Sequence, residues 1–356
     1  MRKRYLFIGA IILVILYFIF RPYLGKKFVN DKIDRDSEWY VNDLYMSDQY
    51  YYDSILTASE QKVYKELFEG IKNIDEKIVI ERCDLNKVMD ALIMDHPELI
   101  NLTTYSYRIL SSEIIIEPEY ITTSERKLKR MIAEVQTVIT KVEKKTRDMD
   151  EFEKEQYIYE YLGENSRYRT QNLSNQSAYT GLVKGENTVC AGYGKGAQIL
   201  FQNVGLDSYI LLGNQHLWNL VCIEDEWYYF DATCTYVPNC YNTISYSGLN
   251  MDIVQTYGND AYGVLYPAGL PQPNGTKYNY FTYMDYILED VYDFDKIEEI
   301  IEDIDKDDEF LEFRLVNVTV DGFTNAFYDY ADDLEDLGYD DKFSYIGNII
   351  RIKEDW

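Results

Sequence analysis

The chain has 356 residues, with 35 basic and 62 acidic side chains and a formal net charge of −27. So acidic a body repels phosphate groups, which argues against nucleic-acid binding. A hydrophobic content of 46% is ordinary for a folded protein, so a largely disordered chain is excluded. The excess acid either keeps the surface soluble or attracts a cationic partner, and composition leaves both interpretations open.

The amino terminus contains an apolar run from Tyr5 to Phe20, preceded by three basic residues and followed by Arg21. As a helix, this run spans about 24 Å, and it can be extended if Arg21 reaches back to the headgroups. A cleavable signal peptide would end in small residues, which do not occur here. We therefore expect a retained signal anchor over 1–28, with a membrane span at about 5–24.

Basic residues lie on both sides of the expected span, so their distribution barely discriminates between the two orientations. The simplest arrangement keeps the short amino terminus inside the cell and the acidic body outside. The sequence thus predicts a single-pass protein of the cell membrane with an extracytoplasmic body.

Five cysteines are spread through the body, and their spacing matches no zinc pattern. If one of them is a nucleophile, the other four can form two disulfides outside the cell, or all can remain buried thiols. The cysteines are Cys83, Cys190, Cys222, Cys234 and Cys240.

Apolar periodicity divides the body into three parts. The first, 29–150, is expected to be mainly helical; the second, 151–292, to be a central domain; and the third, 293–356, to be a small, separable α/β module. In the first part we expect a helix from Thr57 with Glu60 completing a capping box, a helix over 84–95, two strands within 103–117, and a long helix after Thr123.

The middle part changes character because glycines cluster between residues 181 and 213. Expected here are a helix over 150–162, a helix from Cys190 to Asn203, and strands over 207–213, 216–223 and 226–233. The tail is expected to contain a helix near 294–304, a strand near 309–317, a helix near 324–336 and a strand near 343–353.

Cys190 opens its expected helix directly after a glycine-containing loop. The positive end of a helix favours thiolate and can lower a cysteine pKa from about 8.5 to below about 7.5. Free backbone N–H groups at the same end can bind an oxyanion. A cysteine at a helix start is nevertheless more often a small buried hydrophobe, so the position needs partners.

Partners follow from the register of the next two strands. If 224–225 forms a two-residue turn, Ile223 pairs with Glu226, and His216 and Asp231 become diagonal neighbours on one face. That face carries His216, Trp218, Asp231 and Thr233. A carboxylate in this position can hold one imidazole nitrogen while the other points at a thiol.

The chain has only two histidines. His96 precedes Pro97 at the end of an expected helix, where a structural role is expected. His216 is therefore the candidate base.

Three ordered segments resemble a known family, the bacterial transglutaminase-like (papain-related) cysteine proteases. The resemblance is most specific over about 150–235. It rests on Ser177-Ala178-Tyr179, Gly181-Leu182-Val183 and Thr188-Val189-Cys190-Ala191-Gly192-Tyr193 for the nucleophile, on Gly213 and His216-Leu217-Trp218-Asn219-Leu220-Val221 for the histidine strand, and on Trp227-Tyr228-Tyr229-Phe230-Asp231-Ala232-Thr233 for the aspartate strand.

This resemblance implies an α+β fold, a papain/transglutaminase-like core in which the cysteine-bearing helix packs on an antiparallel sheet. It implies that 151–292 is the catalytic domain. It also implies Cys190 as nucleophile, His216 as general base and acid, and Asp231 as the residue that orients the histidine. The residues expected to line the substrate site are Tyr179, Tyr193 and Trp218.

The expected function is hydrolysis of peptide or isopeptide bonds through an acyl-enzyme, with a peptide or protein as substrate. A cross-linking acyl transferase and a non-catalytic scaffold that keeps the fold are the alternatives. We expect no cofactor and no metal. Asp303, Asp305 and Asp307 have the spacing of a calcium loop, but no glycine follows and Arg314 takes the final ligand position.

Overall fold

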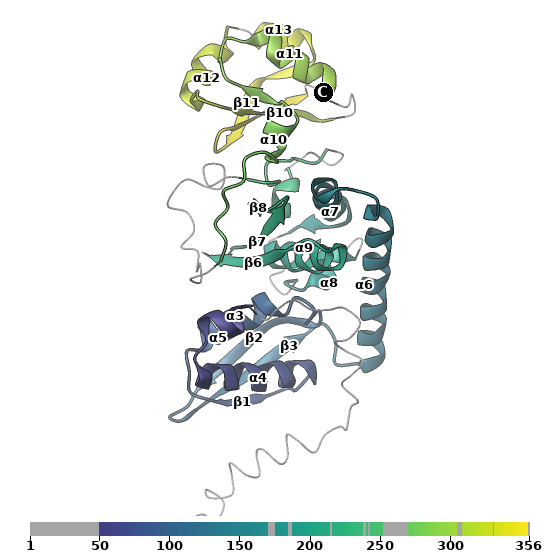
Figure 1. Ribbon diagram of the computed structural model, residues 1–356, viewed down its shortest axis with the longest axis vertical. Helices are drawn as coiled ribbons and strands as arrows, with labels where there is room; N and C mark the ends of the chain where they lie inside the picture. The colour runs from purple at the N-terminus through teal and green to yellow at the C-terminus, as the bar shows by residue number, and fades with distance from the viewer. Residues whose placement is uncertain are drawn as a thin grey trace, which may run out of the picture.

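The fold has three tiers stacked along its long axis, with the carboxyl-terminal module at one end (Figure 1). The computed structural model describes residues 50–169, 175–183, 187–213, 216–237, 240, 243–251, 270–304, 308–329 and 331–354. One contiguous hydrophobic core runs through all three tiers.

The first tier packs helices on a three-stranded antiparallel sheet of order β1-β3-β2. The expected helices and hairpin are observed, and Thr57 and Glu60 form the predicted capping box. Strand β1 was not predicted, so this region contains a sheet as well as helices. The elements are α3 (Tyr50–Ile55), α4 (Ala58–Lys72), β1 (Ile78–Glu81), α5 (Leu85–Asp95), β2 (Leu102–Ile109) and β3 (Glu113–Tyr120).

His96 has the structural surroundings expected from its sequence position. Its Nδ1 lies 2.6 Å from Glu98 Oε1, and its ring stacks on Phe68 at 4.1 Å between centroids. The neighbouring Asp95 accepts hydrogen bonds from the backbone N–H groups of Tyr51 and Tyr52, which fastens α3 to α5.

Two helices join the first tier to the second. Helix α6 (Glu125–Thr146) runs along one side of the molecule past both tiers (Figure 1). Helix α7 (Glu151–Asn165) follows, and Asp150 and Glu153 form a capping box at its start. Their apolar faces pack against α9, so the long helix predicted after Thr123 braces the middle tier from outside.

The middle tier packs a helix on an antiparallel sheet of order β6-β7-β8. Ile223 lies opposite Glu226, so the predicted register is confirmed. The expected third strand is shorter than predicted, because it ends at Phe230 and a 3₁₀ turn follows. The elements are β4 (Arg167–Tyr168), α8 (Ala178–Leu182), β5 (Asn187–Thr188), α9 (Cys190–Val204), β6 (Ser208–Gly213), β7 (His216–Ile223), β8 (Glu226–Phe230) and η1 (Ala232–Thr235).

Two of the clustered glycines let α8 and α9 approach closely. A Cβ at Gly181 would lie 2.1 Å from the carbonyl oxygen of Gly192, and a Cβ at Gly192 would lie 1.8 Å from Thr188 Oγ1. Any side chain at either position would therefore push the start of α9 away from α8.

The carboxyl-terminal module is a four-stranded sheet of order β11-β12-β10-β9 with helices packed against it. The single strand predicted near 343–353 is a hairpin that turns at Gly347, where φ is positive, and the helix predicted near 324–336 is two helices. The elements are α10 (Tyr280–Tyr283), β9 (Ile287–Leu288), α11 (Phe294–Asp303), β10 (Phe310–Leu315), α12 (Val320–Phe327), α13 (Ala331–Asp336), β11 (Tyr339–Ile346) and β12 (Ile349–Glu354).

The module is more firmly joined to the body than the sequence predicted. Strand β9 pairs in parallel with β10, so the sheet begins at Ile287, before the expected boundary at 293. A buried ion pair between Arg351 and Glu312 also contacts Ser245 of the middle tier. The module therefore begins before the predicted boundary and is joined to the middle tier by the common core and by this ion pair, and its independent folding stays a prediction.

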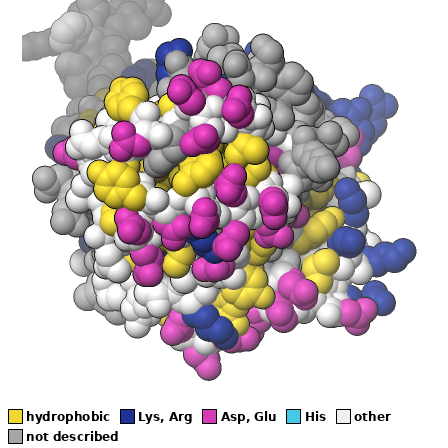
Figure 2. Space-filling model, turned by 90° about the horizontal axis from the view of Figure 1, so that it is seen from above, with side chains coloured by type: hydrophobic (Ala, Val, Ile, Leu, Met, Phe, Trp, Pro, Cys, Tyr) yellow, Lys and Arg dark blue, Asp and Glu magenta, His cyan; other side chains and the backbone are white. Residues whose placement is uncertain are grey.

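The outer face of this module carries much of the acidic charge. Figure 2 shows acidic side chains spread over the end of the molecule, with basic side chains gathered towards one edge. The charge imbalance of the composition is therefore visible as a surface property.

No described helix is both long and apolar enough to cross a bilayer. The expected span at 5–24 lies outside the described residues, so it stays a prediction. Cys83, Cys190, Cys222, Cys234 and Cys240 are all free thiols.

Arg351→Met should lower the free energy of unfolding by about 3 kcal/mol or more, because it leaves the Glu312 carboxylate buried without its cation. Chemical denaturation monitored by circular dichroism measures the change. The matched control is Arg108→Met, which removes the exposed pair of Arg108 with Glu117 and should leave stability nearly unchanged. Equal effects of the two substitutions would contradict a structural role for the buried pair.

Candidate active site

Cys190 is the first residue of α9, and Val189 precedes it in an extended conformation. Two polar side chains fix this helix on the sheet: Asn219 of β7 donates to the Gly194 carbonyl at 3.0 Å and to Gln198 Oε1 at 3.1 Å. Because Asn219 is buried, these bonds lock the rotation of α9, and with it the direction of the thiol.

His216 and Asp231 meet at the ends of adjacent strands. His216 begins β7, and Asp231 directly follows β8; His216 Nε2 lies 2.6 Å from Asp231 Oδ2. The pair is largely buried, with side-chain exposures of 15% and 2%. The sequence placed both residues on one face, and the structure brings them into hydrogen-bond contact.

Asp231 is held by a turn where the sequence predicted continued strand. Its Oδ1 accepts hydrogen bonds from the Thr233 hydroxyl at 2.6 Å and the Thr233 backbone N–H at 3.0 Å. This local bond caps the 3₁₀ turn and ends the strand, as short polar side chains often do. Thr233 therefore supports the carboxylate instead of facing His216 across a strand pair.

The Cys190 thiol completes the cluster, because it acts on the pKa of the His216 ring and His216 acts on the pKa of the thiol. Since Nε2 contacts Asp231, Nδ1 is the nitrogen left for the sulfur. The backbone N–H of Leu217 also favours the thiolate form of Cys190. Burial raises the pKa of the Cys190 thiol, but the bonds and charge of His216 and the Leu217 N–H outweigh it, so the net shift is downward.

The pKa of the His216 imidazole is shifted upwards. Burial lowers the pKa of His216, but the charge and hydrogen bond of Asp231, reinforced by Cys190, raise it to about 10. Burial also raises the pKa of Asp231, yet His216 and Thr233 together hold that pKa below its usual value. These directions favour a thiolate–imidazolium pair beside a carboxylate at neutral pH.

Two further residues near the thiol were not anticipated from the sequence. Lys195 of α9 is buried, and its Nζ donates to the Gln176 carbonyl at 3.0 Å. Burial lowers the pKa of Lys195 to about 8, and the charge of Cys190 opposes that shift. Burial raises the pKa of the Tyr168 phenol, and the charges of Cys190 and Asp231 add to the shift. The signal in the sequence that could have indicated Lys195 is its position, one and a half helical turns after the cysteine.

The three residues expected to line the substrate site have different surroundings. Trp218 stacks on the His216 ring at 5.6 Å between centroids, so it shapes the site from the side. The Tyr179 hydroxyl donates to Glu134 Oε2 at 2.6 Å. Tyr193 is only 1% exposed; its ring stacks on Tyr168 at 6.3 Å between centroids, and the charge of Asp231 is among the causes that raise the pKa of its phenol.

Among the described residues, no group of three histidine, cysteine or acidic side chains could hold a metal ion. Asp305 and Asp307 of the discarded calcium loop lie outside the described residues.

No protein-family model and no curated protein matches the chain by sequence. Two solved structures show a weak likeness. One is a crystal structure of a TGase, with a TM-score of 0.28, 13% identity, and coverage of 46% of this chain and 52% of the other. The second is a candidate cysteine protease from Cytophaga hutchinsonii, with a TM-score of 0.25, 11% identity, and coverage of 41% and 64%.

The chain thus matches between about half and under two thirds of the length of these proteins. The likeness amounts to a weak structural relationship with transglutaminase-like proteins. The functional interpretation rests on the site geometry.

Cys190 should react with iodoacetamide at pH values where other cysteines stay protonated, since only thiolate is nucleophilic. Its pKa is lowered, whereas burial raises the pKa of Cys83, Cys222 and Cys240. The rate at Cys190 should therefore persist as pH falls below about 8.5. Peptide mass spectrometry of a timed pH series measures this, and Cys222 is the control; identical pH profiles would contradict the lowered pKa.

Proposed function

We propose that this protein is a thiol enzyme that hydrolyses peptide or isopeptide bonds through Cys190, His216 and Asp231. The observation that carries the proposal is the 2.6 Å contact between His216 Nε2 and Asp231 Oδ2, beside a Cys190 thiol that acts on the same ring. A carboxylate, an imidazole and a thiol in that order form the arrangement that activates a sulfur nucleophile.

In the first step, the Cys190 thiolate attacks the substrate carbonyl carbon. Negative charge develops on the carbonyl oxygen, and the backbone N–H groups at the start of α9 can stabilise it. The imidazolium of His216 then protonates the leaving nitrogen, the C–N bond breaks, and a thioester to sulfur remains. Asp231 keeps the ring oriented and stabilises its positive charge.

In the second step, neutral His216 takes a proton from water, and the resulting oxygen nucleophile attacks the thioester. The C–S bond breaks, the acid product leaves, and the thiolate–imidazolium pair is restored. An amine in place of water would make the same intermediate yield a new amide, so hydrolase and transferase share this chemistry up to the acceptor.

Substitutions at the three residues test the proposal. Cys190→Ala should abolish turnover, because no other group can form the thioester, and His216→Ala should be comparably severe. Asp231→Asn should reduce turnover by about 10³-fold or more while leaving it measurable, since an amide can still position the ring. Cys222→Ala, which removes a thiol far from the ring pair, is the control and should retain activity.

Turnover is measured with dimethylated casein and a fluorescent primary amine in one reaction. Fragments without incorporated label indicate hydrolysis, whereas fluorescent casein indicates acyl transfer. Full activity of Cys190→Ala, or no turnover and no trapped thioester in the wild type, would remove the proposed chemistry and favour the scaffold interpretation.

We further propose that the protein is held in the cell membrane by its amino terminus, with the catalytic body outside. The support is the apolar run from Tyr5 to Phe20, flanked by basic residues and lacking a cleavage site. An acidic body is compatible with a location beside, but not inserted into, an anionic membrane surface.

Protease added to intact cells should therefore degrade the body while the amino-terminal segment stays in the membrane fraction. Immunoblotting of the fractions measures both parts, and a cytoplasmic marker protein controls for lysis. A protected body, or a mature amino terminus near residue 28, would contradict the anchored topology.

A further inference from the structure

The carbonyl oxygen of Gly248 accepts a hydrogen bond from the backbone N–H of Asp231 at 2.9 Å. Tyr229 and Met251 form an antiparallel bridge beside it. The segment from Gly248 to Met251 therefore lies against the end of β8 like a short extra strand, and it fixes the backbone from which the Asp231 carboxylate projects.

Gly248 lies so close to the backbone of Asp231 that no side chain would fit at its position. A Cβ at Gly248 would lie 2.1 Å from the Asp231 carbonyl oxygen and 3.0 Å from the Tyr159 hydroxyl. Any displacement of Gly248 towards Asp231 would therefore move the residue that holds His216.

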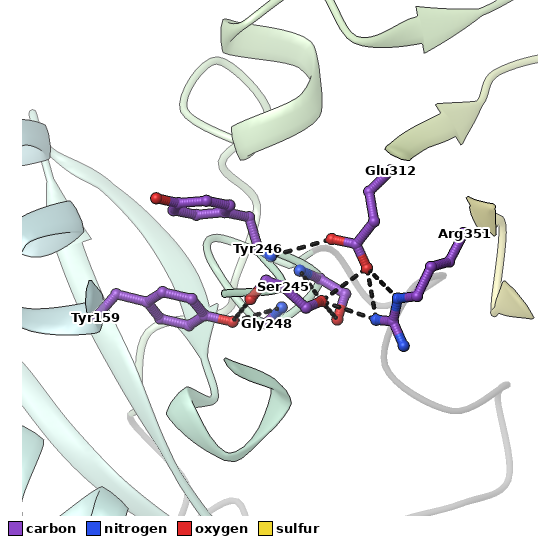
Figure 3. Close-up of polar contacts among 7 residues, drawn as sticks. Tyr159, Ser245, Tyr246, Gly248, Glu312 and Arg351 are labelled. Carbon is purple, nitrogen blue, oxygen red and sulfur yellow. Dashed lines mark hydrogen bonds and ion pairs between the residues drawn. The ribbon is translucent and has the colours of Figure 1, made fainter. Parts of the chain in front are cut away.

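Tyr159 of α7 holds the loop that contains Gly248. Its hydroxyl donates to the Ser245 carbonyl at 2.8 Å and accepts from the Gly248 N–H at 3.1 Å, so it clamps both ends of the 245–248 loop (Figure 3). The ring is fully buried and packs edge-on against Phe230. The clamp is thus rigid and is shielded from water.

The carboxyl-terminal module holds the same loop from the other side. Arg351 of β12 donates to Glu312 of β10 at 2.7 Å and to Ser245 Oγ at 2.9 Å. Glu312 accepts from the Ser245 hydroxyl at 2.8 Å and from the Tyr246 N–H at 3.2 Å. Figure 3 shows these groups converging on the loop from the two sides, with Tyr159 opposite the ion pair.

We infer that the carboxyl-terminal module is part of the active site's support: Arg351 and Glu312 position Asp231 through the 245–248 loop and Tyr159. This inference rests on the proposed role of Asp231 in orienting His216. Arg351, Glu312, Ser245 and Tyr159 are positioning residues, since none of them touches the reacting atoms.

The reason for such a long support lies in the geometry of the pair. Strand β8 ends at Phe230, so the β7–β8 ladder does not hold Asp231. A shift of about 1 Å in a supporting group can cost about 10²-fold in rate. The loop replaces the missing ladder, and the buried ion pair anchors the loop.

Two variants of the full-length chain break successive links. Ser245→Ala removes the hydroxyl that binds Arg351 and Glu312, so only the Tyr246 N–H still links the loop to Glu312, and Tyr159→Phe releases the loop ends while keeping the ring. Tyr161→Phe is the matched control on the same helix, because it removes a buried hydroxyl that donates to the Leu182 carbonyl at 3.0 Å, away from the loop.

Histidine-selective ¹⁵N labelling lets the His216 ring be titrated by NMR. Asp231 and Cys190 are ionisable groups that act on this ring. In both test variants the His216 midpoint should fall by about one pH unit, because a displaced Asp231 carboxylate stabilises the imidazolium less. Tyr161→Phe should leave the His216 midpoint unchanged.

Unchanged His216 titration in both test variants, alongside a loss of thermal stability equal to that of Tyr161→Phe, would overturn the inference and reduce the network to structural packing. If Tyr159→Phe fails to fold, Ser245→Ala decides the question. A wild-type Cys190 that reacts no faster than Cys222 would instead refute the proposed function, and the His216 titration would still report whether the loop positions Asp231.

Discussion

The hydrogen bond between His216 Nε2 and Asp231 Oδ2 is the contact on which the rest of the site depends. The bond lies at the ends of two strands, where the hydrogen-bond ladder between β7 and β8 stops. Every nearby element contributes to keeping it: Thr233 holds one carboxylate oxygen, Gly248 holds the Asp231 backbone, and Trp218 stacks on the imidazole. Two groups that must stay 2.6 Å apart need several such contacts, because motion of their side chains and backbone would otherwise separate them.

Electrostatic interactions determine which of the groups in the site carry protons. Burial alone would favour neutral groups throughout the site. The buried carboxylate of Asp231 reverses this for His216, and His216 in turn favours thiolate at Cys190. The charged forms of Asp231, His216 and Cys190 therefore lie close together, and each is stabilised by its neighbour. Loss of one of the three changes the protonation of the others.

The division into tiers follows the same logic. The middle tier supplies the three residues of the proposed active site, α6 and α7 brace the helix that bears Cys190, and the carboxyl-terminal module reaches the loop beside Asp231 through Glu312 and Arg351. A buried ion pair is expensive to desolvate, so its presence at this junction is better understood as fixing one arrangement than as adding stability. Its side-chain partner across the interface is the short hydroxyl of Ser245, which also hydrogen-bonds to the hydroxyl of Ser247.

The sequence by itself determined the features that are set locally. The turn at 224–225 and strict alternation defined the register that aligns His216 with Asp231, and the capping box at Thr57 marked a helix start. Only the tertiary structure decided the rest. Asp231 leaves its strand because its carboxylate accepts hydrogen bonds from the Thr233 backbone N–H and hydroxyl, and Tyr193 is buried because of how α9 packs. The contacts of Ser245 with Tyr159 and Arg351 span 86 and 106 residues, and no local pattern encodes pairs so far apart because their meeting depends on how whole tiers pack.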